Sequence, residues 1–311
     1  MTVLVLVGPT ATGKSRLAVA VARRLAARGQ PAEVVNADSM LVYRGMDIGT
    51  AKPPAAEREG VRHHLIDVLD VRGTATVADF QQRARAVIAD CFDRGVTPVL
   101  VGGSALYVRA IVDDFRFPGT DPALRTELEA ELARTGPEPL HRRLAELDPT
   151  SAAQILPGNG RRVVRALEVI ALTGDLFSAT LPARRYALPD VVQVGLDIDR
   201  VTLDRRIAER VDTMWADGLV EEVRRLADAG LREGRTASRA LGYRQVLAYL
   251  DGELTEDEAR ARTVTATRKF ARRQDGWFRK DPRITWLAHD RPDLAHAVVS
   301  RTAAPAGRVP D

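Results

Sequence analysis

Eight residues near the start of the chain have the composition and spacing of a phosphate-binding loop. They fit the pattern G-x-x-x-x-G-K-[ST], in which backbone N–H groups surround a di- or triphosphate. The lysine of the pattern brings a positive charge to the phosphates, and the hydroxyl of Ser15 is a ligand for Mg²⁺. The sequence therefore predicts a diphosphate site with Mg²⁺ as cofactor. Its residues are Gly8, Pro9, Thr10, Ala11, Thr12, Gly13, Lys14 and Ser15.

A carboxylate follows the next strand-like run of the chain. Residues 33–37 are β-prone and lead directly into Asp38. Because ligands bind beyond the carboxyl ends of the strands in an open parallel sheet, we expect Asp38 to face the same crevice as the phosphate loop. Asp38 is the first catalytic candidate. The residues alone leave two alternatives open: Asp38 could cap the next segment, or it could hold a water molecule bound to Mg²⁺.

The elements that must position these residues alternate between strands and helices. The period of the apolar residues distinguishes the two kinds of element. Strands are predicted at residues 3–7, 33–37, 97–101 and 191–197, and helices at 16–25, 77–94, 203–229 and 259–280. This pattern is typical of an α/β fold, here a P-loop NTPase-like parallel sheet flanked by helices.

Gly102 and Gly103 come directly after the strand predicted at residues 97–101. Two glycines there indicate either a tight strand-to-helix turn or a close approach of the backbone to a ligand. The same strand lacks the terminal aspartate that helps to hold the metal ion in ordinary ATPases.

The pattern changes from alternating elements to helices alone near residue 117. Helices are predicted there at residues 124–134, 139–147 and 161–172, before strand-like text returns at 191. We interpret residues 117–189 as an all-helical insertion domain. Residues 1–116 are then the first part of the core, 190–290 its second part with basic C-terminal helices, and 291–311 a partly disordered tail.

Two basic clusters favour a polyanionic partner. The segment 259–280 carries eight Arg or Lys residues and one acid, interleaved with aromatic residues, which suits a nucleic-acid backbone. A second cluster, Arg161, Arg162 and Arg165, lies in the insertion, where positions 161 and 165 share a helix face. For the segment 259–280 the alternative of a basic face that contacts only solvent stays open.

The composition excludes several classes of protein. The single cysteine excludes a disulfide framework and any zinc site built from several cysteines. The chain shows no signal-peptide pattern and no apolar run of about 18 residues, so we expect a cytoplasmic protein without membrane contact. A metal ion is not expected at His63 and His64, since adjacent residues point in different directions and no acid or cysteine lies at ligand spacing.

Beyond the phosphate loop, the sequence resembles bacterial tRNA dimethylallyltransferases over about residues 1–287. The most specific match is the block DSMLVYRGMDIGTAKP at residues 38–53. Further matches are HHLID at 63–67, VGGSALY at 101–107, RVVRALEV at 162–169, GLVEEV at 218–223, LGYRQ at 241–245 and ARRQ at 271–274.

The resemblance implies an enzyme that moves the dimethylallyl group of dimethylallyl diphosphate to the exocyclic amine of the adenosine 3′-adjacent to the anticodon, position 37, in tRNAs. It implies that Asp38 is the general base for that amine and that Arg206 assists at the leaving diphosphate. The implied partners are the anticodon stem-loop of tRNA and dimethylallyl diphosphate, and we expect a monomer. The implied tRNA contacts are Asp38, Ser39, Met40, Leu41, Ser104, Arg125, Arg161, Arg162, Val163, Val164, Arg165, Gly242, Tyr243 and Arg244.

Three positions depart from the pattern of this family. Leu41 stands where most relatives have Gln, so a hydrogen bond from that amide to the RNA is absent or replaced. Ser104 stands where Thr is usual and keeps the hydroxyl, and Arg161 adds charge where Gln is frequent. Eukaryotic relatives add a zinc finger that one cysteine cannot provide, which indicates the bacterial form.

Two other functions would use the same residues. A P-loop kinase would bind ATP in the same loop and phosphorylate a nucleoside or a small metabolite, but the two basic clusters count against it. A non-catalytic RNA-binding module would use a nucleotide as a switch, and it would not need the carboxylate of Asp38.

Overall fold

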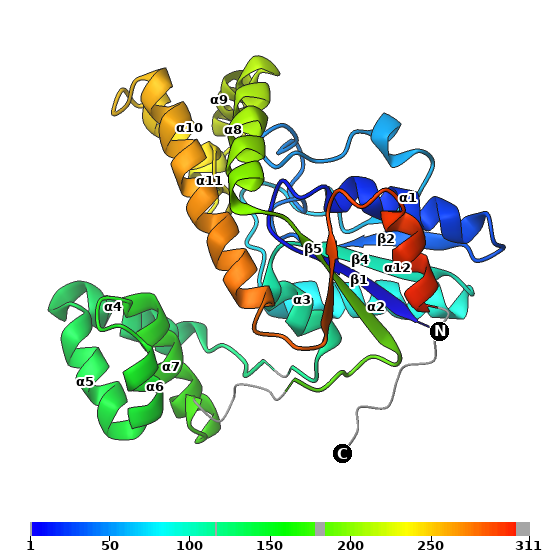
Figure 1. Ribbon diagram of the computed structural model, residues 1–311. Coiled ribbons are helices and arrows are strands. Elements are labelled where there is room, and N and C mark those ends of the chain that lie inside the picture. Colours follow the sequence, from blue (N-terminus) through cyan, green and yellow to red (C-terminus); the bar gives the residue numbers. More distant parts are fainter. Residues whose placement is uncertain (1, 116, 178–183, 303–311) are drawn as a thin grey trace. The chain divides into compact units, whose positions relative to one another are not determined.

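The computed structural model describes residues 2–115, 117–177 and 184–302 (Figure 1). The chain divides into two compact units. Unit 1 comprises the residues up to Val112 and those from Leu188 onward, and unit 2 comprises Asp113–Ala187. The predicted insertion, 117–189, is shifted from unit 2 by a few residues at each end, because the linkers that enter and leave the helices pair with each other through a bridge between Asp113 and Tyr186.

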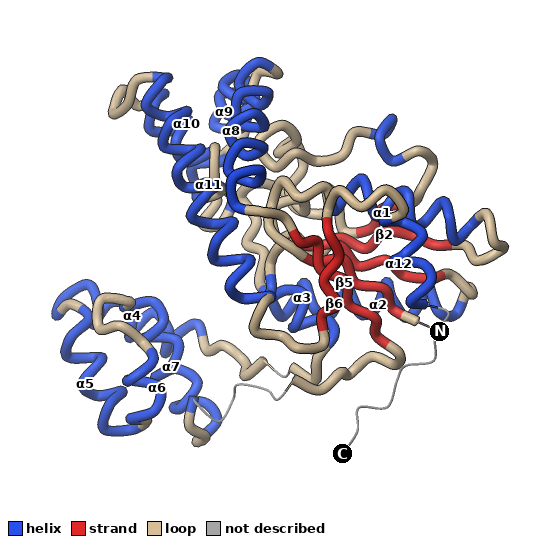
Figure 2. The backbone as a smooth tube through the Cα atoms, in the orientation of Figure 1, coloured by secondary structure: helices blue, strands red, loops and turns tan. Residues whose placement is uncertain are grey.

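Unit 1 is built on a parallel sheet whose strand order is β3-β2-β4-β1-β5-β6 (Figure 2). Its strands are β1 (Val3–Val7), β2 (Ala32–Asn36), β3 (His63–His64), β4 (Thr97–Gly102), β5 (Val191–Asp197) and β6 (Ile284–Ala288). The four predicted strands are confirmed, with β2 one residue earlier than expected. The sequence analysis missed β3, which has only two residues, and β6, which follows the basic segment.

Helices cover both faces of this sheet. On one face, α1 (Lys14–Ala26) lies beside α12 (Leu294–Thr302) (Figure 1). Leu17, Val21 and Leu25 of α1 recur about every four residues and pack with Leu4 and Leu6 of β1 in one buried cluster. On the other face, α2 (Val77–Asp93) contacts β2 and β4, and α3 (Ala105–Val112) contacts β4. Burial on both faces explains why the strands are continuous apolar runs.

The C-terminal part of unit 1 adds a group of helices. These are α8 (Arg200–Ala216), α9 (Leu219–Asp228), α10 (Tyr243–Leu250) and α11 (Glu256–Phe278), with α11 packed on both α8 and α10. The single helix predicted at 203–229 is wrong, because Gly218 adopts φ 94° and separates α8 from α9. The start of α11 is fixed by a capping box between Thr255 and Glu258.

Unit 2 consists of helices in its described residues. They are α4 (Pro122–Thr135), α5 (Pro137–Leu147), α6 (Pro149–Gln154) and α7 (Gly160–Thr173). Leu128, Leu140, Leu144, Val163 and Leu167 form the centre of its core. The sequence analysis missed α6, a short helix that begins with a proline after the capping carboxylate of Asp148.

The tail predicted at 291–311, with disorder expected only in residues 302–311, contains a helix in its first part. Residues 294–302 form α12, whose Ala297, Val298 and Val299 are buried in the core cluster of unit 1. The apolar face of these residues explains why they fold onto the sheet. Residues 303–311 lie outside the described residues.

None of the helices in the described residues has the length and apolar character needed to cross a membrane.

Gly102, the last residue of β4, leaves no room for a side chain. A Cβ there would lie 2.5 Å from the carbonyl oxygen of Ala37, the residue before Asp38. We expect Gly102→Ala to lower the free energy of unfolding of unit 1 by about 2 kcal/mol, because backbone atoms must move. Urea titration followed by tryptophan fluorescence measures this, since all three tryptophans, Trp215, Trp277 and Trp286, lie in unit 1.

Gly276→Ala is the matched control. Gly276 lies inside α11 with nothing within 4 Å of an added Cβ, so alanine there should stabilise by about 0.5 to 1 kcal/mol. Equal effects of the two substitutions would contradict the packing argument.

Candidate active site

The phosphate loop joins the end of β1 to the start of α1. Gly8 (φ 140°), Ala11 (φ 64°) and Gly13 (φ 94°) have positive φ, and a Cβ on Gly8 would lie 3.3 Å from the carbonyl oxygen of Leu196. The two glycines of the pattern are therefore required by the turn itself. The loop ends at the N-terminus of α1, where unpaired N–H groups and the helix dipole favour an anion.

Lys14 points its ammonium group into this loop. Its Nζ donates to the carbonyl oxygen of Pro9 at 2.5 Å and lies 3.5 Å from the hydroxyl of Thr12. Burial lowers the pKa of Lys14 to about 7, Asp38 opposes this shift, and Arg210 adds to it. Lys14, Asp38 and Arg210 thus share one electrostatic neighbourhood at the phosphate loop.

Asp38 follows β2 at the carboxyl edge of the sheet, where the sequence predicted it. The buried side chain of Asn36 fixes its backbone: Asn36 accepts from the N–H of Asp38 at 2.8 Å and donates to its carbonyl at 2.9 Å. Oδ1 of Asp38 accepts from the N–H of Met40 at 2.8 Å, so the capping alternative holds for this oxygen. Oδ2 receives no hydrogen bond from any described residue, and the carboxylate is half-exposed. One oxygen positions the group and the other is left for chemistry.

Arg210 is the arginine that the structure brings to the phosphate loop. It donates to Thr10 Oγ1 at 3.2 Å and to the carbonyl of Thr50 at 3.3 Å. Burial lowers the pKa of its guanidinium, and Asp38 opposes this shift. Arg206, the predicted residue, lies one turn earlier on α8 and forms no hydrogen bond or ion pair within the described ranges. Four residues apart, the two arginines share a helix face, so spacing could not distinguish them.

Gln274 of α11 is a second residue that sequence reasoning missed. Its Oε1 accepts from the N–H of Thr10 at 2.9 Å, and its Nε2 donates to the carbonyl of Gly103 at 2.8 Å. A Cβ on Gly103 would lie 2.4 Å from that Nε2. The close approach at Gly102 and Gly103 is therefore an approach to Ala37 and Gln274, which are parts of the protein.

Four predicted tRNA contacts are half-exposed: Ser39, Met40 and Leu41, which directly follow Asp38, and Ser104, which follows β4. Tyr107 of α3 lies beneath this segment, hydrogen-bonded to Ser39 and packed edge-on against Phe80, with ring centroids 5.0 Å apart. Burial raises the pKa of Tyr107 to about 12, so its hydroxyl stays protonated. Tyr107 supports the segment that carries Asp38.

Three of the predicted tRNA contacts have buried side chains. Val163 and Val164 belong to the core of unit 2, and Tyr243 is fully buried in unit 1. These side chains cannot contact RNA, because the apolar periodicity of their helices turns them inward. Gly242 is also buried, whereas Arg244 is exposed. The structure gives no support for side-chain contact at Val163, Val164 and Tyr243, and tRNA contact at these residues and at Gly242 stays a prediction.

Two of the predicted RNA-binding arginines have acidic partners. Arg125 and Arg165 both bind the carboxylate of Glu168, which is fully buried in α7; the Arg165 distance is 2.7 Å. Burial opposes ionisation, but the two guanidinium groups hold the pKa of Glu168 below its ordinary value. Arg165 also donates to the carbonyls of Pro118 and Gly119. Arg161 and Arg162 are exposed and form no ion pair with described residues.

Half of the cations in the basic segment 259–280 form ion pairs with acidic residues of unit 1. Arg260 pairs with Asp212, Arg268 and Arg272 with Asp204, and Arg279 with Asp197. The remaining cations, Arg262, Lys269, Arg273 and Lys280, are exposed and form no ion pair in the described part of the chain. Charge counting along the sequence could not see these partners, which come from α8 and β5.

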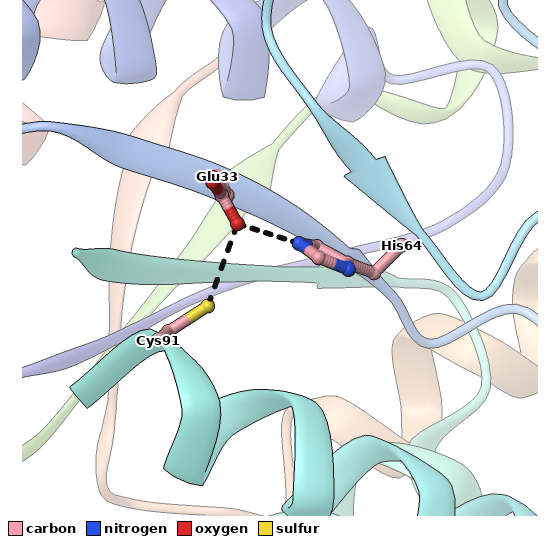
Figure 3. Close-up of side chains that lie close together, drawn as sticks. All are labelled: Glu33, His64 and Cys91. Carbon is pink, nitrogen blue, oxygen red and sulfur yellow. Dashed lines mark hydrogen bonds and ion pairs between the residues drawn. The ribbon is translucent and has the colours of Figure 1, made fainter. Parts of the chain in front are cut away.

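His64 lies in a group that the sequence could not reveal. Glu33 and Cys91 join it, and one candidate ligand atom of each lies within 4.8 Å of the others (Figure 3). Arg94 already binds both oxygens of Glu33, at 2.9 and 2.7 Å. Its hydrogen bonds, together with that from His64, lower the pKa of Glu33 to about 2, although burial alone would raise it. Burial raises the pKa of the Cys91 thiol to about 11. The guanidinium of Arg94 thus already supplies positive charge to this group. The group lies at the start of β2, whereas Asp38 follows the other end of that strand.

The low pKa of Lys14 predicts a pH-dependent affinity for pyrophosphate. A bound anion raises this pKa, so binding takes up a proton once the free ammonium has lost its own above about pH 7. We expect the affinity for pyrophosphate to fall by up to about fivefold from pH 7 to 8. Calorimetry in two buffers of different ionisation enthalpy measures the proton uptake. Lys14→Met is the control that leaves only the ligand's own titration, and an unchanged pH profile in this variant would contradict the assignment.

Comparison with known proteins shows the family of this chain. The sequence model described as IPP transferase matches residues 41–281. A protein of a Nocardioides species named tRNA dimethylallyltransferase is 61% identical over 302 residues, covering 97% of this chain and 96% of the relative. A Thermobifida fusca protein of the same name is 62% identical over 293 residues, covering 94% of this chain and 92% of the relative.

Solved structures agree with the sequence relatives. The full-length tRNA isopentenylpyrophosphate transferase of Bacillus halodurans is 40% identical, with a TM-score of 0.69 and coverage of 97% of this chain and 94% of that one. A eukaryotic dimethylallyltransferase acting on tRNA is 27% identical, with a TM-score of 0.81 and coverage of 97% and 77%. Since the family model spans most of the sequence and the relatives align almost end to end, this chain belongs to the IPP transferase family.

Proposed function

We propose that this protein transfers the dimethylallyl group from dimethylallyl diphosphate to the exocyclic amine of the adenosine 3′-adjacent to the anticodon in tRNAs, releasing diphosphate. The observation that carries the proposal is the carboxylate of Asp38 in the same electrostatic neighbourhood as Lys14 and Arg210 at the phosphate loop. Membership of a transferase family, with relatives named tRNA dimethylallyltransferase, decides against a kinase and against a non-catalytic RNA-binding module.

The phosphate loop would hold the leaving group. As the bond between carbon and the diphosphate oxygen breaks, negative charge gathers on that oxygen. The amides at the start of α1, the ammonium of Lys14 and the guanidinium of Arg210 are positioned to stabilise this charge where it develops. Phosphate oxygens would replace the carbonyl of Pro9 as the acceptor for Lys14.

Ser15 fits the role of a Mg²⁺ ligand. It lies in the first turn of α1, and its side chain is exposed beside the loop. A Mg²⁺ ion bound there would neutralise part of the charge on the diphosphate. Asp38 Oδ2 could face the same ion through water, which is the alternative to its role as a base.

Asp38 would act on the nucleophile. An aryl amine is a weak nucleophile, so removal of its proton as the new N–C bond forms would accelerate the transfer. The amine nitrogen forms a bond to the carbon that loses diphosphate, and its proton passes to Oδ2 of Asp38. Oδ1 keeps its hydrogen bond to the N–H of Met40, which holds the carboxylate in place during this step.

The tRNA would present its adenine outside the stacked anticodon loop, because a stacked base cannot reach a carboxylate at the carboxyl ends of the strands. The exposed candidates for RNA contact are Ser39, Met40, Leu41, Ser104 and Arg244 in unit 1, and Arg161 and Arg162 in unit 2. Arg125 and Arg165 would contribute while paired with Glu168. A monomeric state stays a prediction.

The direct test mixes the protein with labelled dimethylallyl diphosphate, Mg²⁺ and unmodified tRNA. We expect the label in the adenosine next to the anticodon. Label that stays in the diphosphate or enters another nucleotide would overturn the proposal.

Asp38→Asn keeps the shape of the side chain and removes its basicity. We expect the transfer rate to fall about 10² to 10⁴-fold while the Kd for tRNA changes little. Single-turnover label transfer and filter binding measure the two quantities. Transfer at the parent rate would show that Asp38 is not the base.

Arg210→Ala and Arg206→Ala distinguish the two arginines of α8. Loss of a donor aimed at the leaving group costs about 10² to 10³ in kcat, and we expect that loss for Arg210→Ala because Arg210 alone of the two contacts the loop. Arg206→Ala should lose clearly less. The reverse order of kcat values would restore the sequence-based assignment.

A further inference from the structure

Glu222 is a buried carboxylate that no step of the proposed reaction uses. It lies in the first turn of α9 and is 2% exposed. Its Oε2 accepts from the N–H groups of Asp47 and Ile48 at 3.1 and 2.8 Å, and its Oε1 accepts from the N–H of Gly49 at 3.2 Å. Three consecutive backbone donors thus converge on one carboxylate, which makes these hydrogen bonds charge-assisted.

Tyr243 completes this arrangement from α10. Its hydroxyl donates to Oε1 of Glu222 at 2.6 Å, and its ring is fully buried. A Cβ on Gly49 would lie 2.5 Å from that ring, so the ring packs directly on the backbone of Gly49. Glu222 and Tyr243 therefore hold the segment 47–49 by hydrogen bonds and by contact.

The next residue of this segment touches the active site. The carbonyl of Thr50 accepts from Nη2 of Arg210, while Nη1 of the same guanidinium donates to Thr10 in the phosphate loop. The guanidinium of Arg210 is thus held between the phosphate loop and the segment that Glu222 fixes. A shift of segment 47–50 would remove one of its two anchors.

Lys52 ties the same segment on its other side. Its buried ammonium donates to the carbonyl of Tyr43, to Asp47 and to Asp67, at 2.8, 2.6 and 2.5 Å. These bonds fix the ends of the segment, but they do not reach its middle, where the N–H groups of Ile48 and Gly49 point at Glu222. Hydrogen bonds within the turn also shape the middle: Thr50 Oγ1 donates to the carbonyl of Met46 at 2.6 Å, and the N–H of Ala51 donates to the carbonyl of Ile48 at 2.9 Å. Glu222 is the contact that ties the middle to α9.

We propose that Glu222, supported by Tyr243, is a positioning residue that sets the guanidinium of Arg210 at the phosphate loop by fixing residues 47–50. The inference rests on the proposed function only in that Arg210 acts on the diphosphate. It predicts a coupling between two residues, Glu222 and Arg210, that share no hydrogen bond and act through the carbonyl of Thr50.

Glu222→Gln tests the proposal with little change of shape. The amide offers one acceptor oxygen instead of two, so at least one of the three N–H groups loses its partner. Hydrogen exchange at residues 47–49 should become faster than in the unsubstituted protein, and the affinity for pyrophosphate with Mg²⁺ should fall about tenfold. Tyr243→Phe removes only the hydroxyl and should have a smaller effect in the same direction.

A double-mutant cycle separates positioning from general destabilisation. In the Arg210→Ala background, Glu222→Gln should weaken pyrophosphate binding no further, because the residue through which it acts is gone. Glu168→Gln, which alters a buried carboxylate of unit 2, is the matched control and should leave pyrophosphate affinity unchanged. Additive effects of Glu222→Gln and Arg210→Ala, or unchanged exchange at residues 47–49, would overturn the proposal.

The same measurements keep the two proposals apart. Binding of pyrophosphate without transfer of the dimethylallyl group would contradict the proposed function but not the positioning role of Glu222. Unchanged pyrophosphate affinity in Glu222→Gln would contradict the positioning role but not the proposed transfer reaction.

Discussion

The burial of positive charge at the end of β1 is the constraint on which the active site depends. Lys14 and Arg210 are both partly removed from water, and burial lowers the pKa of each. Removing two like charges from water is unfavourable, and Asp38 offsets only part of that cost. A bound polyanion would offset the rest. Under the proposed function, a bound diphosphate would therefore stabilise the site, which is the property that a leaving-group cradle needs.

Four carboxylates show how one chemical group takes different tasks in different surroundings. Glu33 and Glu168 are neutralised by arginines and connect elements within their units. Glu222 is satisfied by backbone N–H groups and a hydroxyl, and no cation in the described part of the chain pairs with it. Asp38 alone of these keeps an oxygen without a hydrogen bond from the described residues, and it stands half-exposed at the sheet edge. The available oxygen, and not the residue type, sets Asp38 apart as the proposed base.

The sequence predicted those features that depend on local pattern. The phosphate loop, four strands and the position of Asp38 after β2 follow from glycine spacing and apolar periodicity, and the structure confirms their places in the fold. Arg210, Gln274 and Glu222 were missed because their roles depend on partners far away in the chain: Gln274 meets Thr10 across 264 residues. Likewise, the sequence could not show that Arg125, a predicted RNA contact, also belongs to an ion-pair network with Glu168, which lies 43 residues away.

The segments that lead into and out of unit 2 run antiparallel to each other where they meet. Asp113 bridges to Tyr186, and the N–H of Asp114 donates to the carbonyl of Arg185 at 2.8 Å. Because the two ends of the helical unit are held together, the number of residues between α3 and β5 does not affect how β4, α3 and β5 pack in unit 1. The helices could thus be exchanged, lengthened or trimmed during evolution while the sheet and the phosphate loop stayed intact, so the two units can diverge separately.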